Sequence, residues 1–229
     1  MVVDSSTPAV TAALVRVGDD VVTLLAERVT VDARAHGELL APQIAAVLAE
    51  GEAAVGDLTA VVAGVGPGPF TGLRAGMVTA AALGHALNIP VYGVCSLDGI
   101  GFGMPGRVLV ATDARRKEIY WATYADGVRV QGPEVAKPDE VAAAFGLTPG
   151  DTAGEGIDGV ALTGSGDGAE KYAAVLGLPV AGPRYPSALA LAALAAERIR
   201  AKAPSETLTP LYLRRPDAVL PGDRKPALR

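Results

Sequence analysis

Apolar positions along the chain follow two periods, and their alternation predicts the order of the elements. Runs rich in β-branched residues predict strands, whereas apolar residues three and four positions apart predict helices. The first hundred residues then give strand, strand, strand, helix, strand, helix and strand. These are predicted at 2–29 (three strands, with breaks at 5–8 and 18–20), 34–50, 58–65, the small-residue stretch from about Gly72, and 89–94.

The second half of the chain repeats this order. Asp126-Gly127 is a two-residue hairpin signal between two predicted strands, and the acidic, glycine-rich segment 146–159 predicts an exposed, mobile loop. The remaining strands are predicted at 108–112, 118–124, 128–131, 160–163 and 179–181, and the remaining helices at 138–145 and 168–176. The predicted fold is therefore α/β, with two tandem βββαβα domains.

A helix rich in alanine and leucine is predicted at 187–203, with Ser187 as its N-cap. It is too short to cross a membrane. We assign residues 1–103, together with this closing helix, to the N-terminal half and residues 104–186 to the C-terminal half. Residues 204–229 turn basic and contain proline, which predicts a docked strip followed by a loose tail.

A glycine- and proline-rich turn at 66–69 joins a buried strand to a helix, and such a turn often binds phosphate through backbone N–H groups. The details do not fit that role. A Walker A loop needs Lys where Leu73 stands, and the GxGxxG spacing puts Thr71 or Pro69 in the place of its last glycine. Prolines also lack the N–H donor. We favour a turn that sets the direction of the helix.

Small residues recur every fourth position along that helix, so Gly72, Gly76, Ala80 and Gly84 form one ridge. Internal glycines cost about 1 kcal/mol each relative to Ala, and we expect close packing against the ridge to offset this loss. The packing partner is either this chain's own sheet or a neighbouring helix, or else the helix of another subunit. Sequence alone leaves these alternatives open.

Composition limits the classes of function. The 229 residues, half of them hydrophobic, can bury one large core or two ordinary ones. A net charge of −5 argues against a free-standing nucleic-acid binder, so any RNA contact is expected to be local or supplied by a partner. We find no signal-peptide pattern or membrane-length apolar run and expect a cytoplasmic protein. Cys95, the single cysteine, is expected to be a small buried hydrophobe.

Short sequence motifs connect this pattern to known proteins. Two βββαβα copies with a closing helix resemble the actin, Hsp70 and sugar-kinase (ASKHA) fold. Five stretches, in order along nearly the whole chain, resemble the TsaB (YeaZ) family: AHGELL at 35–40, GPGPFTGLR at 66–74, DARRKEIY at 113–120, GDGAEKY at 166–172 and YLR at 212–214.

The resemblance implies a non-catalytic subunit in the synthesis of threonylcarbamoyladenosine at position 37 of tRNA. It implies a TsaD-like catalytic partner of the same fold, a TsaE-like ATPase that joins them, tRNA bound only through the complex, and no membrane contact. A homodimer of the chain alone stays open. The helix near His36 and the ridge helix would bundle with matching helices of the partner, through Leu39, Leu40, Gln43, Gly72, Leu73, Gly76, Met77, Ala80 and Gly84. This favours another subunit on the ridge.

The catalytic relative is expected to carry a metal-binding His-x-x-x-His just after the strand that follows the ridge helix. Ser96 and Ile100 stand at those positions here, and isoleucine cannot ligate a metal. His36 and His85 are too far apart in sequence to form a spaced pair. We therefore predict no metal site, and a metallopeptidase would need ligands that this sequence lacks.

Nucleotide binding depends on three weak candidates: Asp4, Asp113 and Arg115. In active kinases of this fold a glycine-rich hairpin follows the acid of the second half, whereas basic side chains fill the turn at 115–117 here. We favour a solvated turn and predict no cofactor, with ATP or ADP bound at most at a partner interface. The alternative function is a nucleotide-dependent phosphotransferase with Asp4 and Asp113 as metal–phosphate acids. Arg74, unfavourable in a first helical turn, is expected to have an acidic partner.

Overall fold

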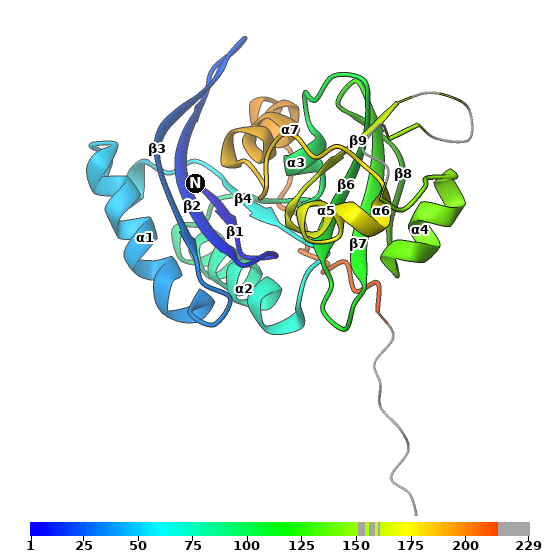
Figure 1. Ribbon diagram of the computed structural model, residues 1–229. Coiled ribbons are helices and arrows are strands. Elements are labelled where there is room, and N and C mark those ends of the chain that lie inside the picture. The colour runs from blue at the N-terminus through cyan, green and yellow to red at the C-terminus, as the bar shows by residue number, and fades with distance from the viewer. Residues whose placement is uncertain (151–153, 156–158, 160, 215–229) are drawn as a thin grey trace, which may run out of the picture.

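The computed structural model describes residues 1–150, 154–155, 159 and 161–214 and contains two sheets side by side (Figure 1). The first sheet has the strand order β3-β2-β1-β4-β5. Its strands are β1 (Val2–Asp4), β2 (Ala9–Val17), β3 (Val22–Val31), β4 (Val61–Gly64) and β5 (Val91–Val94). The first three strands are antiparallel, and β1, β4 and β5 are parallel. The sheet therefore joins a meander to a parallel α/β unit.

Helices cover both faces of this sheet because successive strand residues point to opposite faces. Val3 and Ala12 pack beneath α1 (His36–Glu50) and α2 (Phe70–Leu87), whereas Val2 and Ala13 pack against α7 (Ala188–Arg200). A short 3₁₀ turn, η1 (Val55–Asp57), precedes β4. The side chain of Ser187 accepts a hydrogen bond from the Ala190 N–H at 3.3 Å, which confirms the predicted cap of α7.

The second sheet has the order β8-β7-β6-β9. Its strands are β6 (Arg107–Asp113), β7 (Ile119–Ala125), β8 (Val128–Ala136) and β9 (Leu162–Ser165). One face packs against α4 (Pro138–Phe145), α5 (Asp167–Lys171) and α6 (Ala173–Leu176). The other face turns toward the first half, where Leu97 and Ile100, beside and within α3 (Asp98–Gly101), pack on Val108 and Val110.

The predicted α/β fold with two βββαβα units is confirmed, and the differences are local. The helix α3 is absent from the prediction, and the strand expected at 179–181 is reduced to an isolated bridge between Val180 and Gly164. The single helix expected at 168–176 divides into α5 and α6 at Tyr172, whose φ is −114°. β8 continues beyond the predicted 128–131, because Gly132 and Pro133 lie in a bulge opposite Ala122. Part of the loop at 146–159, and the tail at 215–229, lie outside the described residues.

The strip formed by residues 203–213 runs along β5, the edge strand of the first sheet. Ser205 Oγ accepts a hydrogen bond from the Val91 N–H at 3.0 Å, and the Glu206 N–H donates to the Val91 carbonyl at 2.9 Å. Beyond the strip, Arg214 forms an ion pair with Glu118 of the second half. The strip thus connects the two halves. Among the described residues we find no helix with the length and apolar character needed to span a membrane.

Candidate functional site

Asp4 is sealed inside the first half. It is 1% exposed, and its carboxylate accepts hydrogen bonds from the Ser6 N–H at 3.0 Å, from Ser6 Oγ at 2.9 Å and from Ser96 Oγ at 2.6 Å. Burial raises the pKa of Asp4, although the hydrogen bonds from Ser96 and Ser6 act to lower it. A side chain on Gly64 would overlap the carboxylate. Asp4 therefore fastens the strand ends together and does not fit the predicted role of a metal–phosphate acid.

Asp113 and Arg115 lie at the junction of the two halves. The Asp113 carboxylate accepts hydrogen bonds from Lys171 Nζ at 3.0 Å and from the Arg115 N–H at 3.1 Å. The hydrogen bond to Asp113 raises the pKa of Lys171. Asp113 and Arg115 border a cleft of about 270 Å³ that is also lined by Ser5, Thr7, Pro8, Ala33, His36, Pro69, Phe70, Thr71 and Gly72. Lys171 forms an ion pair with Asp113, and Asp4 does not line this cleft. Asp4 and Asp113 together therefore do not fit a metal–phosphate centre.

The two positions that correspond to metal-binding histidines serve the fold. Ser96 Oγ accepts a hydrogen bond from the Gly66 N–H at 3.1 Å and donates to Asp4, while the side chain of Ile100 is fully buried in the apolar core. Among the described residues, no three His, Cys, Asp or Glu side chains come together in a way that could hold a metal ion. Cys95 is buried as predicted, and burial raises the pKa of its thiol to about 11.

The small-residue ridge of α2 faces the sheet of its own chain. Ser5 Oγ donates to the Gly72 carbonyl at 2.7 Å and accepts from the Gly76 N–H at 2.8 Å, and a side chain on Gly76 would overlap it. A side chain on Gly84 would likewise overlap Val91 of β5. The preference for another subunit on this ridge is therefore wrong, because β1, the turn after it and β5 already occupy the space.

The other predicted interface residues also point inward. Leu40, Gln43, Leu73, Met77 and Ala80 are buried, and Leu39 packs half-buried against the same core. Gln43 Nε2 donates to Thr30 Oγ1 at 2.7 Å, and His36 Nε2 lies 2.9 Å from the Thr7 carbonyl oxygen. This correction moves any helix-mediated interface to the opposite faces of α1 and α2.

Those outward faces are composed largely of small and apolar residues. The exposed residues of α1 are Gly37, Glu38, Ala41, Pro42, Ala45, Ala49 and Glu50, and those of α2 are Phe70, Thr71, Arg74, Val78, Ala81, Ala82, His85 and Ala86. Val78 is 65% exposed. Because α1 and α2 also contact each other, their outward faces form one surface. Small residues on such a surface let a further helix approach closely.

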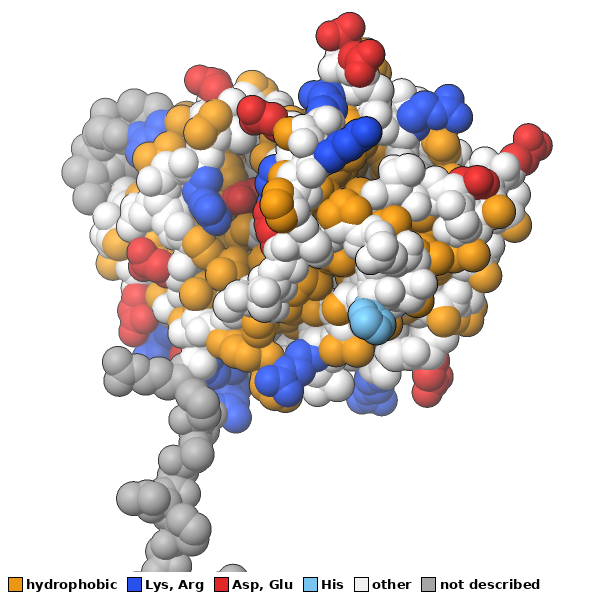
Figure 2. All heavy atoms as spheres, turned by 180° about the vertical axis from the view of Figure 1, so that it is seen from behind, with side chains coloured by type: hydrophobic (Ala, Val, Ile, Leu, Met, Phe, Trp, Pro, Cys, Tyr) orange, Lys and Arg blue, Asp and Glu red, His pale blue; other side chains and the backbone are white. Residues whose placement is uncertain are grey.

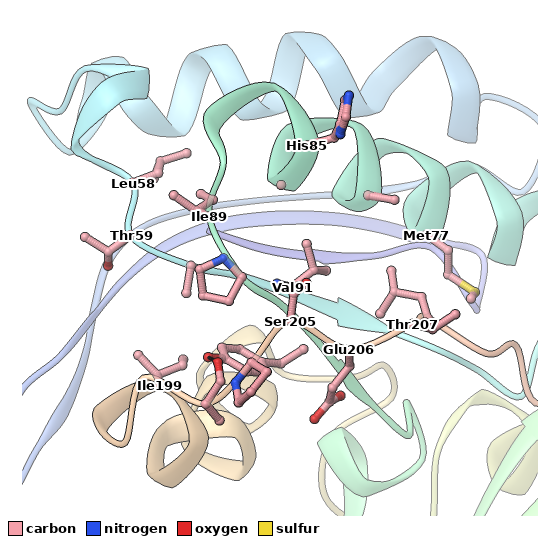
Figure 3. Close-up of a pocket in the computed structure, with 18 of the residues that line it drawn as sticks. Leu58, Thr59, Met77, His85, Ile89, Val91, Ile199, Ser205, Glu206 and Thr207 are labelled. Carbon is pink, nitrogen blue, oxygen red and sulfur yellow. Dashed lines mark hydrogen bonds between the residues drawn. The ribbon is translucent and has the colours of Figure 1, made fainter.

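A groove of about 1460 Å³ lies beside this surface, between α2, the end of α7 and the strip. Figure 3 shows Ile89, Val91 and Ile199 toward its interior, with Met77 at the α2 side and His85 pointing away from it. Apolar side chains gather across the hollowed middle of the face in Figure 2. Burial acts to raise the pKa of Glu206 at the strip, but hydrogen bonds from Arg198 and the Gly93 N–H outweigh it, so this pKa is lowered.

Arg74 has aromatic partners where an acidic one was expected. Its Cζ lies 3.8 Å from the centre of the Phe70 ring, and its Nε donates to the Tyr212 hydroxyl at 2.5 Å. Phe70 and Tyr212 stack with their ring centres 5.4 Å apart. This cluster is not among the predicted site residues. The spacing of Phe70 and Arg74, one helical turn apart, was the available signal, but nothing local pointed to Tyr212.

Comparison with known proteins shows the family. Residues 23–218 match the family described as TsaD: tRNA N6-adenosine threonylcarbamoyltransferase. The chain belongs to the TsaD family, in its TsaB (YeaZ) group. Its fold is similar to that of YeaZ from Pseudomonas aeruginosa, with a TM-score of 0.68 and 25% identity over 92% of this chain and 98% of that one. A second Pseudomonas aeruginosa structure, described as similar to peptidase YEAZ, gives a TM-score of 0.71 at 27% identity over 93% of this chain and 98% of that one.

Among sequences, a Mycobacterium bovis protein is 52% identical over 95% of this TsaB-group chain and 92% of its own length. A Mycobacterium leprae relative is 50% identical over 95% of this chain, which spans 55% of that protein's length. The tRNA threonylcarbamoyladenosine biosynthesis protein TsaB of Escherichia coli is 35% identical over 40% of this chain and 42% of its own length. The TsaB relatives indicate a role in that biosynthesis.

Proposed function

We propose that this chain is a non-catalytic subunit that binds a TsaD-like threonylcarbamoyltransferase in the synthesis of threonylcarbamoyladenosine at tRNA position 37. Membership of the family supports a role in this biosynthesis. The structural roles of Ser96 and Ile100 support a non-catalytic subunit. Ser96 anchors Asp4, and Ile100 fills the core at the positions where the catalytic relative is expected to bind its metal. Neither side chain fits a metal ligand in this setting. The chain then contributes to the reaction by holding its partner.

The outward face of α1 and that of α2 from Val78 onward form the proposed interface, and the observation that carries this is their composition. Ala41, Ala45 and Ala49 line one helix, and Val78 and Ala81 line the neighbouring one. A pair of partner helices can approach these residues closely and exclude water over both helices at once. The inward faces are already filled by the chain's own core. We therefore still propose a helix bundle with the partner, but the contact is made by the outward faces of α1 and α2 and not by the faces that were predicted from the sequence.

The same surface accounts for the other proposed partners. In the absence of TsaD, two copies of the chain would pair through these faces about a two-fold axis, because one patch then meets itself. A TsaE-like ATPase would join the assembled pair. ATP or ADP would bind at most at the partner interface, because Lys171 already holds Asp113. We also propose a cytoplasmic location, where tRNA is modified.

Size-exclusion chromatography of the full chain with a TsaD partner tests this proposal. The wild-type chain should co-elute with the partner. Val78→Glu and Ala45→Glu each place a charge in the proposed interface and should weaken binding about 30-fold or more, which is the scale of an interface hot spot of about 2 kcal/mol. Val130→Glu is the matched control, because Val130 on β8 is 69% exposed and Val78 is 65% exposed. It should co-elute as wild type.

Two results would contradict the proposal. Unchanged co-elution of both interface variants, with circular dichroism confirming their folds, would exclude the outward faces as the contact. Saturable ATP turnover by the purified chain alone, abolished by Asp113→Asn, would instead favour the phosphotransferase.

A further inference from the structure

An exposed aromatic cluster, defined here as Phe70, Arg74 and Tyr212, lies where α2 begins and the strip ends. Phe70 is 56% exposed and Tyr212 43% exposed, and their rings stack at an interplanar angle of 24°. Among the described residues, Arg74 contacts these two rings and forms no ion pair with a carboxylate. The cluster therefore presents partly exposed rings beside a cation that pairs with no acid in the described part of the chain.

A cationic turn, residues 115–117, stands near this cluster at the end of the β6–β7 hairpin. Arg115, Arg116 and Lys117 have φ values of 64°, 53° and 63°, all in the left-handed region. Non-glycine residues pay about 1–2 kcal/mol each to adopt it. The turn is held in place, because Asp113 accepts the Arg115 N–H and Arg214 donates to the Arg115 carbonyl at 3.4 Å. Three long basic side chains thus occupy positions where glycine would be easier to accommodate.

The aromatic cluster and the cationic turn belong to one surface. Phe70 and Arg115 line the same cleft of about 270 Å³, and Tyr212 lies two residues before Arg214, which contacts the turn. Among the described residues, this surface carries the basic side chains Arg74, Arg115, Lys117 and Arg214 and the acidic side chains Asp113 and Glu118. Asp113 is further neutralised by Lys171. The described residues of this surface are therefore mainly positive, whereas the whole chain has a net charge of −5.

We propose that this surface binds single-stranded RNA, with a nucleobase on the Phe70 ring and neighbouring phosphates on the cationic turn. Exposed rings beside cations are the combination that recognises unpaired nucleotides, since every base has a face that can stack. A duplex hides those faces. The inference rests on the proposed function, in which the RNA is the tRNA loop that carries the modified adenosine. The negative charge of the chain makes this a local contact that adds to the binding by the assembly.

Fluorescence anisotropy with a labelled RNA hairpin of seven unpaired loop nucleotides tests this inference on the full chain. Binding should weaken as salt rises. Lys117→Ala should reduce the slope of log affinity against log salt by about 0.7, because each phosphate contact on a single strand contributes about 0.7. Phe70→Ala should weaken binding about 5- to 150-fold, corresponding to the loss of one stacked base.

Matched controls distinguish binding at this surface from a general effect of removing an exposed ring or an exposed positive charge. Phe102→Ala removes an aromatic side chain of comparable exposure, 44%, outside the cluster. Lys137→Ala removes one exposed lysine from another part of the chain. Both controls should bind the hairpin as wild type does. Equal loss in controls and surface variants would overturn the proposal, as would wild-type binding that is no tighter to the hairpin than to a blunt duplex of equal length.

Two further measurements distinguish RNA from a free nucleotide and from a protein partner as the ligand of this surface. ATP at 1 mM should leave hairpin binding unchanged, and its displacement of the hairpin would assign the cleft to a free nucleotide. Phe70→Ala and Lys117→Ala should still co-elute with the TsaD partner. Loss of co-elution with RNA binding retained would mean that the surface belongs to a protein interface, which overturns this inference and leaves the proposed function intact. If Val78→Glu co-elutes while Phe70→Ala loses RNA, the proposed interface fails and the RNA contact stands.

Discussion

Replacing Gly76 by Ala tests which side of α2 is packed. The added methyl group would overlap Ser5 Oγ, which now accepts the Gly76 N–H and donates to the Gly72 carbonyl. Overpacking of this kind costs about 1–3 kcal/mol, and disturbing two buried hydrogen bonds costs about 1 kcal/mol each. Alanine returns about 1 kcal/mol through its higher helix propensity. The net expectation is a loss of about 3 kcal/mol in the free energy of unfolding.

Thermal unfolding followed by far-ultraviolet circular dichroism measures this loss. For a chain of this size, about 3 kcal/mol lowers Tm by about 6–12 °C. Gly37→Ala is the matched control, because nothing lies within 4 Å of the position of its new methyl group, so it should raise stability by about 0.5–1 kcal/mol. In Ser5→Ala/Gly76→Ala the hydroxyl is gone, and the two substitutions should show a favourable coupling of about 1–2 kcal/mol.

The reasoning is refuted if Gly76→Ala is as stable as wild type and fails to co-elute with a TsaD partner. That combination would mean that the ridge faces another subunit. A destabilised Gly76→Ala with no coupling to Ser5→Ala would also refute it, because the loss would then arise elsewhere.

Two more predictions concern buried polar groups. Asp4→Ala leaves three donors on Ser6 and Ser96 without their acceptor and should lower the free energy of unfolding in urea by about 3–5 kcal/mol. Asp139→Ala, at an exposed position of α4, is the control and should lower it by under about 0.5 kcal/mol. Equal effects of the two substitutions would contradict the role given to Asp4. Burial raises the pKa of Cys95 to about 11, so native alkylation at pH 8 should be roughly 200-fold slower than in the urea-unfolded chain. Its rate should rise about tenfold per pH unit up to about pH 11, and a native rate within tenfold of the unfolded one would disagree.

The order of elements could be predicted from sequence because each depends on local periodicity and turn chemistry. The signals used for this are local in sequence: each depends on residues only a few positions apart. They include the N-cap at Ser187, the hairpin at Asp126-Gly127 and the apolar face around Leu40. The break between α5 and α6 could not be predicted in the same way. It falls at Tyr172, whose backbone leaves helical geometry while the apolar pattern continues across it.

The direction of the ridge could not be predicted, because small residues are compatible with any close neighbour. Ser5, which decides the question, is 67 residues from Gly72 along the chain, so no window around the helix contains it. Arg74 shows the same limit. Its unfavourable position at a helix start was recognised, but its partner Tyr212 is 138 residues away. Stacking on a ring stabilises a cation without any acid, and a charge pattern does not reveal this.

The strip along β5 has a consequence for how the chain behaves in solution. An edge strand presents unpaired N–H and carbonyl groups, to which a strand of another molecule can add. Here Ser205 and Glu206 take up the N–H groups of Val91 and Gly93, and Arg198 donates to the Gly93 carbonyl at 3.1 Å. A chain cleaved after Ala203 would lose this cover together with Leu208 and Leu211, which pack against the core of the first half, so that an open strand edge would border an apolar groove. The C-terminal segment thus protects the first sheet against aggregation.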